Sequence, residues 1–377
     1  MNNTDIVKNI KTASLDEITY LIGNFSDEDM RAAYLSARQL TDEIFGRKIY
    51  IRGLIEFTNI CRNDCYYCGL RCSNYKAERY RLSEEEIFDC CKKGYELGFR
   101  TFVLQGGEDP YFDDEKMIPI VSKMRKDFTD CAITLSLGER SYESYLHLFE
   151  AGADRYLLRH ETFNAAHYTR LHPDKMSRNN RLKCLYDLKK IGYQTGCGIM
   201  VGSPYQTAGN IAEDLIFIRE FKPEMVGIGP FIPQKDTPFG NMPQGSLKLT
   251  LFLLSLIRLM LPEVLLPATT ALGIKQADGT DAYPEGIGEY PEGTDAHPEE
   301  KDNDGRILGL NAGANVIMPN LSPAENRDKY RIYDNKASAG DDALTQFVNI
   351  RKLLNDAGYE MEIGRGDSKN YVRKKRP

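Results

Sequence analysis

Strand-like runs alternate with helix-like runs along most of this 377-residue chain, and this alternation restricts its fold more than any other feature. The strand-like runs cover residues 54–57, 101–104, 132–137, 155–159, 198–201, 225–228, 264–267 and 315–318. Amphipathic segments or long connections separate them, which is typical of parallel strands joined by right-handed crossovers. Eight such runs predict an α/β fold, a complete (β/α)8 TIM barrel, and favour it over an open doubly wound sheet.

The segments outside this alternation predict the domain organisation. Residues 1–48 form an expected N-terminal helical cap, and the barrel is expected over residues 49–360. Between strands seven and eight, residues 275–304 are rich in Gly, Pro, Asp and Glu. We interpret them as a disordered, low-complexity acidic insertion, because they bury too little apolar surface to fold alone. Residues 361–377 are expected to form a basic, frayed tail.

Charge and cysteine content argue against several classes of protein. A net charge of −6 disfavours a broad nucleic-acid-binding surface. The longest apolar candidate, residues 247–261, contains Lys248 and Arg258 and does not reach the length of a membrane span. The N-terminus lacks the apolar core of a signal peptide, and nine cysteines are an odd number for a disulfide framework. We therefore expect a cytoplasmic protein with reduced thiols.

Cys61, Cys65 and Cys68 follow the first strand-like run at intervals of four and three residues. Thiolates this close in sequence can converge on one centre only if the chain between them is a loop. An iron–sulfur cluster is the favoured interpretation; the alternatives are zinc, which usually draws four ligands in two pairs, and buried apolar thiols. Three ligands on a four-iron cluster would leave one iron open. The other six cysteines, including Cys72, are expected to be core thiols.

Chemistry-bearing residues also follow the other strand-like runs, where a barrel places its active site. Gln105, Gly106, Gly107 and Glu108 follow the second run, and Ser136 lies near the end of the third. Glycines at such positions let a ligand approach backbone N–H and C=O groups closely.

The fourth run carries charged residues on one face. Arg155, Arg159 and Glu161 share that face, because side chains alternate along a strand. Buried charge is costly unless it is paired or bound to a ligand, so the pattern predicts either a ligand site or a structural ion pair. Arg181 begins the following helix, where it could reach a carboxylate ligand or remain solvated.

Thr269 and Thr270 follow the seventh run and, with Arg155, predict an anion pocket deep in the barrel. The alternative is that two β-branched residues simply favour a strand. Met200 and Met225 fit a soft cavity wall or ordinary core filling. Tyr333 is a candidate for closing the cavity from the C-terminal side.

The cysteine loop and the Gly106-Gly107-Glu108 turn resemble the radical S-adenosylmethionine (SAM) superfamily. This resemblance implies one [4Fe–4S] cluster on the three cysteines, with the methionyl group of SAM on the open iron. It implies reductive cleavage of SAM to a 5′-deoxyadenosyl radical. The implied cofactor-binding residues are Tyr67, Gly106, Gly107, Glu108, Ser136, Arg159, Glu161, Arg181 and Met200.

Longer strings resemble the HydE family of [FeFe]-hydrogenase maturases, which is similar to biotin synthase and methylornithine synthase. They cover residues 61–72, 77–81, 102–111, 155–161, 225–233, 267–271 and 314–320. The resemblance implies a cysteine-bound iron carbonyl cyanide synthon as substrate, other maturases as partners, and a flavodoxin- or ferredoxin-type electron donor. The implied substrate or anion pocket comprises Gln105, Arg155, Met225, Thr269, Thr270 and Tyr333.

The chain departs from part of that family at its C-terminal side. Some members carry further cysteines there for an auxiliary cluster, but no cysteine follows Cys197 here. We therefore expect a single cluster. Three alternatives remain: an amino-acid mutase of the methylornithine synthase type, a biotin synthase-like sulfur-transfer enzyme and a non-catalytic iron–sulfur scaffold. Sulfur transfer needs a sacrificial second cluster, and a scaffold has no use for a cofactor-binding turn, so both are disfavoured.

Overall fold

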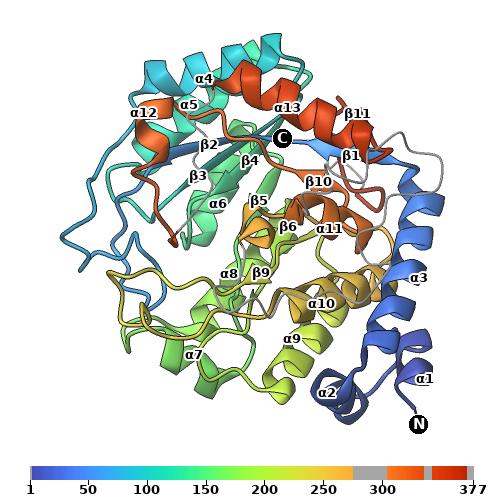
Figure 1. Cartoon of the computed structure of the whole chain (residues 1–377). Helices are drawn as coiled ribbons and strands as arrows, with labels where there is room; N and C mark the ends of the chain where they lie inside the picture. The colour runs from blue at the N-terminus through green and yellow to red at the C-terminus, as the bar shows by residue number, and fades with distance from the viewer. Residues whose placement is uncertain (1, 275–303, 335–341, 372–377) are drawn as a thin grey trace.

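The computed structural model describes residues 2–274, 304–334 and 342–371. Three helices come first, α1 (Asn3–Lys8), α2 (Leu15–Asn24) and α3 (Asp27–Phe45). Ser14 and Ser26 each form a capping box with the acidic residue three positions later, which satisfies the free N–H groups at the starts of α2 and α3. The helices lie along one side of the molecule, where α2 packs on α9 and α3 on α10 (Figure 1).

A six-stranded parallel sheet forms the centre, in the order β2-β3-β4-β5-β6-β8 (Figure 1). Consecutive pairing in one direction confirms the predicted parallel α/β architecture. The strands are β2 (Gly53–Thr58), β3 (Thr101–Gly106), β4 (Ala132–Ser136), β5 (Arg155–Leu157), β6 (Gln194–Cys197) and β8 (Met225–Val226).

Shorter pairings connect the two edges of this sheet. Leu265 bridges Met225 of β8, and Pro267 bridges Val316. A second sheet has the order β10-β1-β11, with β1 (Lys48–Ile51), β10 (Val316–Ile317) and β11 (Glu360–Glu362). Asn320, just beyond β10, bridges Leu54 of β2.

Helices surround the strands on the outside (Figure 1). The most apolar of them, α10, is buried along nearly its whole length against α3 and α11, because leucine and isoleucine occupy every face. The helices after α3 are α4 (Glu84–Glu96), α5 (Asp114–Asp127), α6 (Tyr142–Ala151), α7 (Ala165–Leu171), α8 (Arg178–Ile191), α9 (Ala208–Phe221), α10 (Leu247–Met260), the 3-10 helix η1 (Thr270–Gly273), α11 (Gly305–Asn311), α12 (Ala324–Arg327) and α13 (Ala343–Asp356).

The fifth strand differs from its prediction. We expected it at residues 198–201, but the sheet strand is β6, four residues earlier. Gly198 has φ +159° and separates β6 from the two-residue strand β7 (Met200–Val201). β7 pairs instead with β9 (Gly229–Pro230) in a separate two-stranded sheet. The Gln-Thr-Gly-Cys sequence of β6 is too polar to give a strong strand signal.

The C-terminal segment also differs from the frayed tail expected over residues 361–377. β11 pairs with β1, and the chain after it returns to the amino-terminal ends of the strands. There the backbone oxygen of Arg365 accepts hydrogen bonds from Thr101 Oγ1 at 2.8 Å and Arg155 Nη2 at 2.6 Å. Asp367 pairs with Arg155 Nη2 at 2.6 Å and accepts from Gln194 Nε2 at 2.7 Å. Residues 360–371 therefore form the floor of the strand core.

Two further predictions concern the acidic insertion and membrane-spanning helices. The acidic insertion, apart from Asp304, lies outside the described residues. None of the described helices is long and apolar enough to cross a membrane.

Candidate active site

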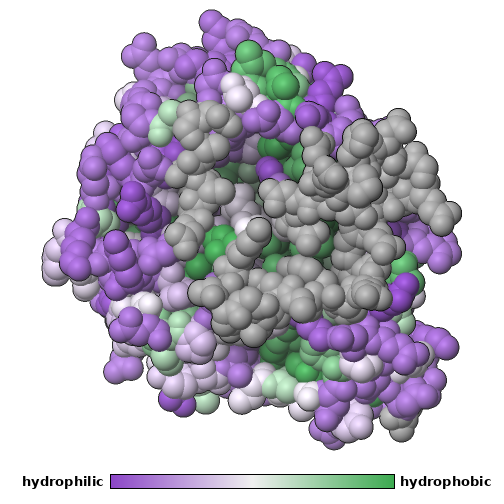
Figure 2. Space-filling view, in the orientation of Figure 1, coloured by the Kyte–Doolittle hydropathy of each residue, from purple (hydrophilic) through white to green (hydrophobic). Residues whose placement is uncertain are grey.

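A cavity of 1460 Å³ opens at the carboxyl ends of the sheet strands. Apolar surface is visible in the hollow at the centre of the face drawn in Figure 2, surrounded by a mainly hydrophilic periphery. Sixteen of the eighteen residues predicted as site residues line this one cavity, so the structure brings together positions from eight separate stretches of the chain. They are Cys61, Cys65, Tyr67, Cys68, Gln105, Gly106, Gly107, Glu108, Ser136, Arg159, Glu161, Arg181, Met200, Thr269, Thr270 and Tyr333.

The three cysteines of the loop after β2 share one wall of the cavity. Burial raises the pKa of all three thiols, that of Cys68 to about 12. Cys61 Sγ accepts from the backbone N–H groups of Asn63 at 3.4 Å and Glu108 at 3.3 Å. Thiolates here need a nearby positive charge, which a metal centre supplies when it deprotonates its ligands. The donor set therefore fits an iron–sulfur cluster.

Among the described residues, no three His, Cys, Asp or Glu side chains are arranged to hold a single metal ion. Cys72 is exposed and does not line the cavity, whereas Cys90, Cys91, Cys131, Cys184 and Cys197 are buried. The expectation of core thiols therefore holds for these five and is wrong for Cys72.

The cysteine loop is fixed by charged residues that the sequence analysis missed. Asp64 accepts two hydrogen bonds from Arg71, at 2.7 and 2.6 Å, and this pairing lowers the pKa of Asp64 well below its usual range. Arg79 donates to four backbone oxygens of residues 59–74. A guanidinium with five donors can organise a loop in this way. The sequence does place Arg71 and Arg79 within one polar stretch, but only the structure shows which groups they bind.

Close packing explains the glycines beside the loop. A Cβ on Gly107 would lie 2.2 Å from the backbone oxygen of Ile60 and 2.8 Å from Cys61 Cβ. A Cβ on Gly69 would lie 2.0 Å from the backbone oxygen of Arg331. Glycine therefore lets the end of β3 touch the cysteine loop, and lets residues 330–333 cross it from the other side.

Charged side chains line the wall next to the cysteines. Arg159 Nη2 lies 2.9 Å from Glu161 Oε2, and Arg181 Nε lies 2.7 Å from Glu139 Oε1. Arg181 Nη2 is also 3.8 Å from Glu108 Oε1. Arg159 and Glu161 form an ion pair and also line the cavity, and Arg181 is ion-paired at the same wall, so the solvated alternative for Arg181 is wrong. Their contacts with a ligand stay a prediction. The carboxylates and guanidinium groups could bind an amine and a carboxylate of a zwitterionic ligand.

Tyr67 lies between the cysteines and this charged wall. Its hydroxyl is 3.1 Å from His172 Nε2, and His172 Nδ1 is 3.0 Å from the backbone oxygen of Tyr168. Burial lowers the pKa of His172 to about 3, so this imidazole is neutral. With Nδ1–H donating to Tyr168, Nε2 accepts from Tyr67, which fixes the tyrosine ring at the cavity wall.

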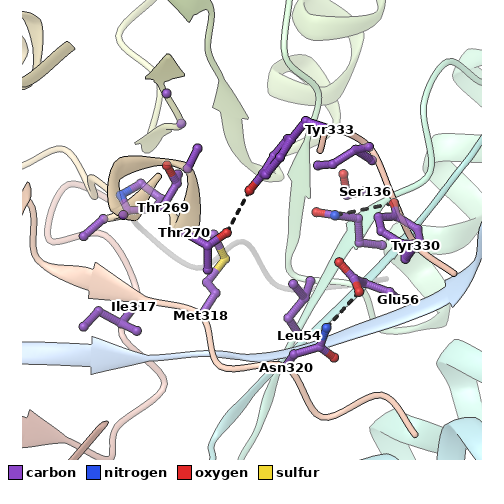
Figure 3. Close-up of a pocket in the computed structure, with 18 of the residues that line it drawn as sticks. Leu54, Glu56, Ser136, Thr269, Thr270, Ile317, Met318, Asn320, Tyr330 and Tyr333 are labelled. Carbon is purple, nitrogen blue, oxygen red and sulfur yellow. Dashed lines mark hydrogen bonds between the residues drawn. The ribbon is translucent and has the colours of Figure 1, made fainter. Parts of the chain in front are cut away.

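A second polar region lies deeper in the cavity (Figure 3). Thr270, an exposed residue at the edge of this region, has its Oγ1 2.9 Å from the hydroxyl of Tyr333. Asn320 Nδ2 donates to Glu56 Oε2 at 2.8 Å (Figure 3). Gln105 Nε2 is 3.5 Å from the hydroxyl of Tyr330, another lining residue. The sequence analysis missed Glu56, Asn320 and Tyr330, because a carboxylate within a strand and a distant tyrosine carry no spacing signal.

Arg155 and Met225 do not line the cavity, and their placement in the pocket is corrected. Arg155 shares a face with Arg159, as predicted, but lies one layer lower, where it pairs with Asp367. Met225 Sδ accepts from Arg52 Nη1 at 2.8 Å and packs with Leu265 and Val316. Both side chains belong to the floor layer closed by the C-terminal segment.

Comparison with known proteins identifies the family. Residues 55–218 match the model of the radical SAM superfamily. The chain is 43% identical over 302 residues to the [FeFe] hydrogenase maturase subunit HydE of Thermotoga maritima, covering 79% of this chain and 78% of that protein. The chain belongs to the HydE family of radical SAM enzymes.

Two other relatives place this HydE-family chain within a wider group. A 3-methylornithine synthase of Methanosarcina acetivorans is 30% identical over 324 residues, covering 84% of this chain and 82% of that protein. The crystal structure of methylornithine synthase (PylB) superposes with a TM-score of 0.76 at 26% identity, covering 96% of this chain and 97% of that one. The family implies a [4Fe–4S] cluster and SAM, and the cavity combines thiols with charged groups suited to both.

Proposed function

We propose that this enzyme takes part in assembly of the [FeFe]-hydrogenase di-iron centre, acting on a cysteine-bound iron carbonyl cyanide synthon. The observation that carries the proposal is a single cavity in which three thiols, a charged wall and a deeper polar region follow one another. When bound, the cluster and SAM supply a 5′-deoxyadenosyl radical. The 43% identity to a HydE maturase subunit supports the assignment to hydrogenase maturation.

Cys61, Cys65 and Cys68 are the proposed cluster ligands, and one iron stays open because Cys72 lies outside the cavity. For SAM, we assign the methionyl amine and carboxylate to the turn of Gly106, Gly107 and Glu108 and to the charged side chains of Arg159, Glu161 and Arg181. Tyr67, Ser136 and Met200 would contact the remainder of SAM. Paired guanidinium and carboxylate groups suit a zwitterion, since each end finds an opposite charge.

The deeper region is the proposed substrate site. Thr269, Thr270, Gln105 and Tyr333 offer hydroxyl, amide and phenol groups that can donate to carbonyl, cyanide or carboxylate groups. The hydrogen bond between Thr270 and Tyr333 joins two of these residues at the cavity wall. A substrate held there would lie between the floor layer and the cofactor.

Several finer points belong to the same proposal. The bridges of Leu265, Pro267 and Asn320 support a complete barrel of eight strands. With no cysteine after Cys197, one cluster is expected to act without an auxiliary cluster. We propose that other maturases exchange the substrate, that a flavodoxin- or ferredoxin-type protein delivers the electron, and that the protein works in a reducing cytoplasm. Nine free cysteines support the last point.

The first test is anaerobic reconstitution with iron and sulfide, followed by reduction and SAM. We expect one cluster and release of 5′-deoxyadenosine. Cys65→Ala should abolish both, whereas the matched control Cys72→Ser should retain them. Cleavage retained by Cys65→Ala would refute the ligand assignment.

The second test separates the maturase from a mutase, which the likeness to methylornithine synthase makes the second candidate. The enzyme is supplied with cysteine-bound iron carbonyl cyanide or with lysine, and products are analysed by mass spectrometry. We expect conversion of the organometallic compound, with the adenosyl group added to its sulfur. Conversion of lysine alone to an isomer would favour the mutase.

A further inference from the structure

A fully buried pair of polar side chains lies directly behind the charged wall of the cavity. His160 stands between two cavity-lining residues, Arg159 and Glu161, and its own ring points away from the cavity toward α9. There His160 Nε2 lies 3.3 Å from Oδ1 of Asp214, and both side chains have 0% exposure. The ring also stacks edge-on against Phe217, one turn along α9.

Asp214 contacts the same turn at a second point. Its Oδ1 accepts a hydrogen bond from the backbone N–H of Phe163 at 2.5 Å. The Asp214 carboxylate therefore contacts His160, the residue before Glu161, and Phe163, two positions after it. The turn from residue 160 to residue 163 is fixed to α9 on both sides of Glu161.

Glu161 is the residue in this turn whose backbone conformation must be stabilised by its surroundings. Its φ is +64°, in the left-handed region that few non-glycine residues adopt. Such a conformation costs about 1–3 kcal/mol and persists only where the surroundings fix it. On the cavity side, the Glu161 N–H donates to the backbone oxygen of Gly198 at 3.1 Å, and Arg159 Nη2 donates to that of Ile199 at 2.6 Å.

The pair has no evident value as a purely stabilising contact. Burial raises the pKa of Asp214, and the neighbouring His160 ring opposes that shift. Asp214 Oδ2 and both ring nitrogens of His160 have no partner that meets hydrogen-bond geometry within the described part of the chain, so the 3.3 Å approach of His160 to Asp214 is a polar contact. Buried ionic or polar pairs are often no more stabilising than apolar residues of the same volume. A positional role therefore accounts better for groups buried at such cost.

We propose that Asp214 and His160 are positioning residues that hold Glu161 in its left-handed conformation, so that the Arg159–Glu161 pair faces SAM. The inference rests on the proposed SAM site but adds residues that do not touch the cofactor. Removal of Asp214 frees the turn on both sides, and Glu161 then relaxes toward ordinary backbone angles. The carboxylate turns away from the cavity, and Arg159 loses its partner.

The experiment measures SAM affinity separately from cluster assembly. Reconstituted wild type, Asp214→Asn, Asp214→Ala and His160→Phe are titrated with SAM, followed by the change in the EPR spectrum of the reduced cluster. We expect SAM to bind about tenfold more weakly to Asp214→Ala, corresponding to about 1.4 kcal/mol, and less weakly to Asp214→Asn, which keeps an acceptor for Phe163. The EPR spectrum without SAM and the iron content should match wild type.

Glu213→Gln is the matched control. Glu213 is the neighbouring residue of α9 and accepts from Asn164 Nδ2 at 3.0 and 3.1 Å, so it anchors the same loop without bracketing Glu161. Its SAM affinity should equal that of wild type. A double variant tests whether Asp214 acts through Glu161. In a Glu161→Ala background, adding Asp214→Ala should weaken SAM binding no further.

Unchanged affinity in Asp214→Ala, additive losses in the double variant, or equal loss in Glu213→Gln would each overturn the proposal. If Asp214→Ala fails to fold by circular dichroism, Asp214→Asn and His160→Phe decide it, since asparagine keeps the volume of aspartate and phenylalanine keeps an aromatic ring beside Phe217. Absence of SAM binding by the wild type would refute the proposed function instead, so the two failures are distinguishable.

Discussion

Replacement of Asp367 by asparagine should destabilise the protein although the residue lies only ten positions before the last residue of the sequence. Asp367 Oδ1 is 2.6 Å from the guanidinium of Arg155, whose side chain is 4% exposed, and the Asp367 side chain is 35% exposed. Breaking a fully buried ion pair costs about 3–5 kcal/mol. Since water partly screens Asp367, we expect a loss of about 2–4 kcal/mol.

That loss converts to a shift in melting temperature. At about 2.1 cal/mol/K per residue, a chain of 377 residues has an unfolding entropy of about 0.8 kcal/mol/K, so Tm should fall by about 3–5 °C. Differential scanning calorimetry under anaerobic conditions measures it. Asp89→Asn on the exposed face of α4 is the matched control and should leave Tm unchanged, since Asp89 has no ion pair among the described contacts.

The pH dependence gives an independent check. Burial alone would raise the pKa of Asp367, but Arg155, Gln194 and Arg365 lower it well below its usual range. A lowered carboxyl pKa contributes stability above the unfolded pKa of about 3.9 and loses it as the pH falls. The difference in Tm between wild type and Asp367→Asn should therefore be constant near neutral pH and should decrease as the pH falls below about 4. A Tm equal to wild type at neutral pH, or a difference that persists in acid, would refute this account of the floor.

Three further predictions concern the cavity. Gly69→Ala places a Cβ 2.0 Å from the backbone oxygen of Arg331 and should cost about 1–3 kcal/mol in chemical denaturation; an unchanged midpoint would contradict the packing. The His172 pKa of about 3 lies below the unfolded value. The free energy of unfolding should therefore be highest above about pH 6.5 and lower by about 3 kcal/mol near pH 4.5. In urea titrations, His172→Asn should reduce this loss. Thr270→Val removes the bond to Tyr333 and should raise KM for the substrate about tenfold, while an equal rise in KM for SAM would place Thr270 elsewhere.

Local patterns in the sequence predicted the parallel α/β architecture and which residues share the cavity. Both rest on rules that act over short distances: alternation of elements, the position of strand ends, and the spacing of Cys61, Cys65 and Cys68. Pattern alone placed Glu161 on the correct wall, although its left-handed φ was not foreseen.

The failures share a different cause, since each depends on a partner far away in the chain. Arg155 was expected in the pocket because its face was correct, but Asp367, 212 positions later, binds it in the floor. Met225 is likewise held by Arg52, 173 positions earlier. Strand β6 ends just before Gly198, where hydrophobicity alone predicted that the fifth strand begins. Such contacts join residues that lie far apart in the chain, and no short window of sequence contains both partners.

The pairing of β1 has a consequence for biosynthesis. Residues 48–51 pair with β10 on one side and with β11 on the other, so a strand made early must wait for residues 360–362 before both edges are covered. During translation, the nascent chain therefore exposes an unpaired strand edge, which is a site for aggregation or for chaperone binding. Contacts this distant in sequence also slow folding. A chain that ends within α13 lacks β11, so one edge of its first strand remains open.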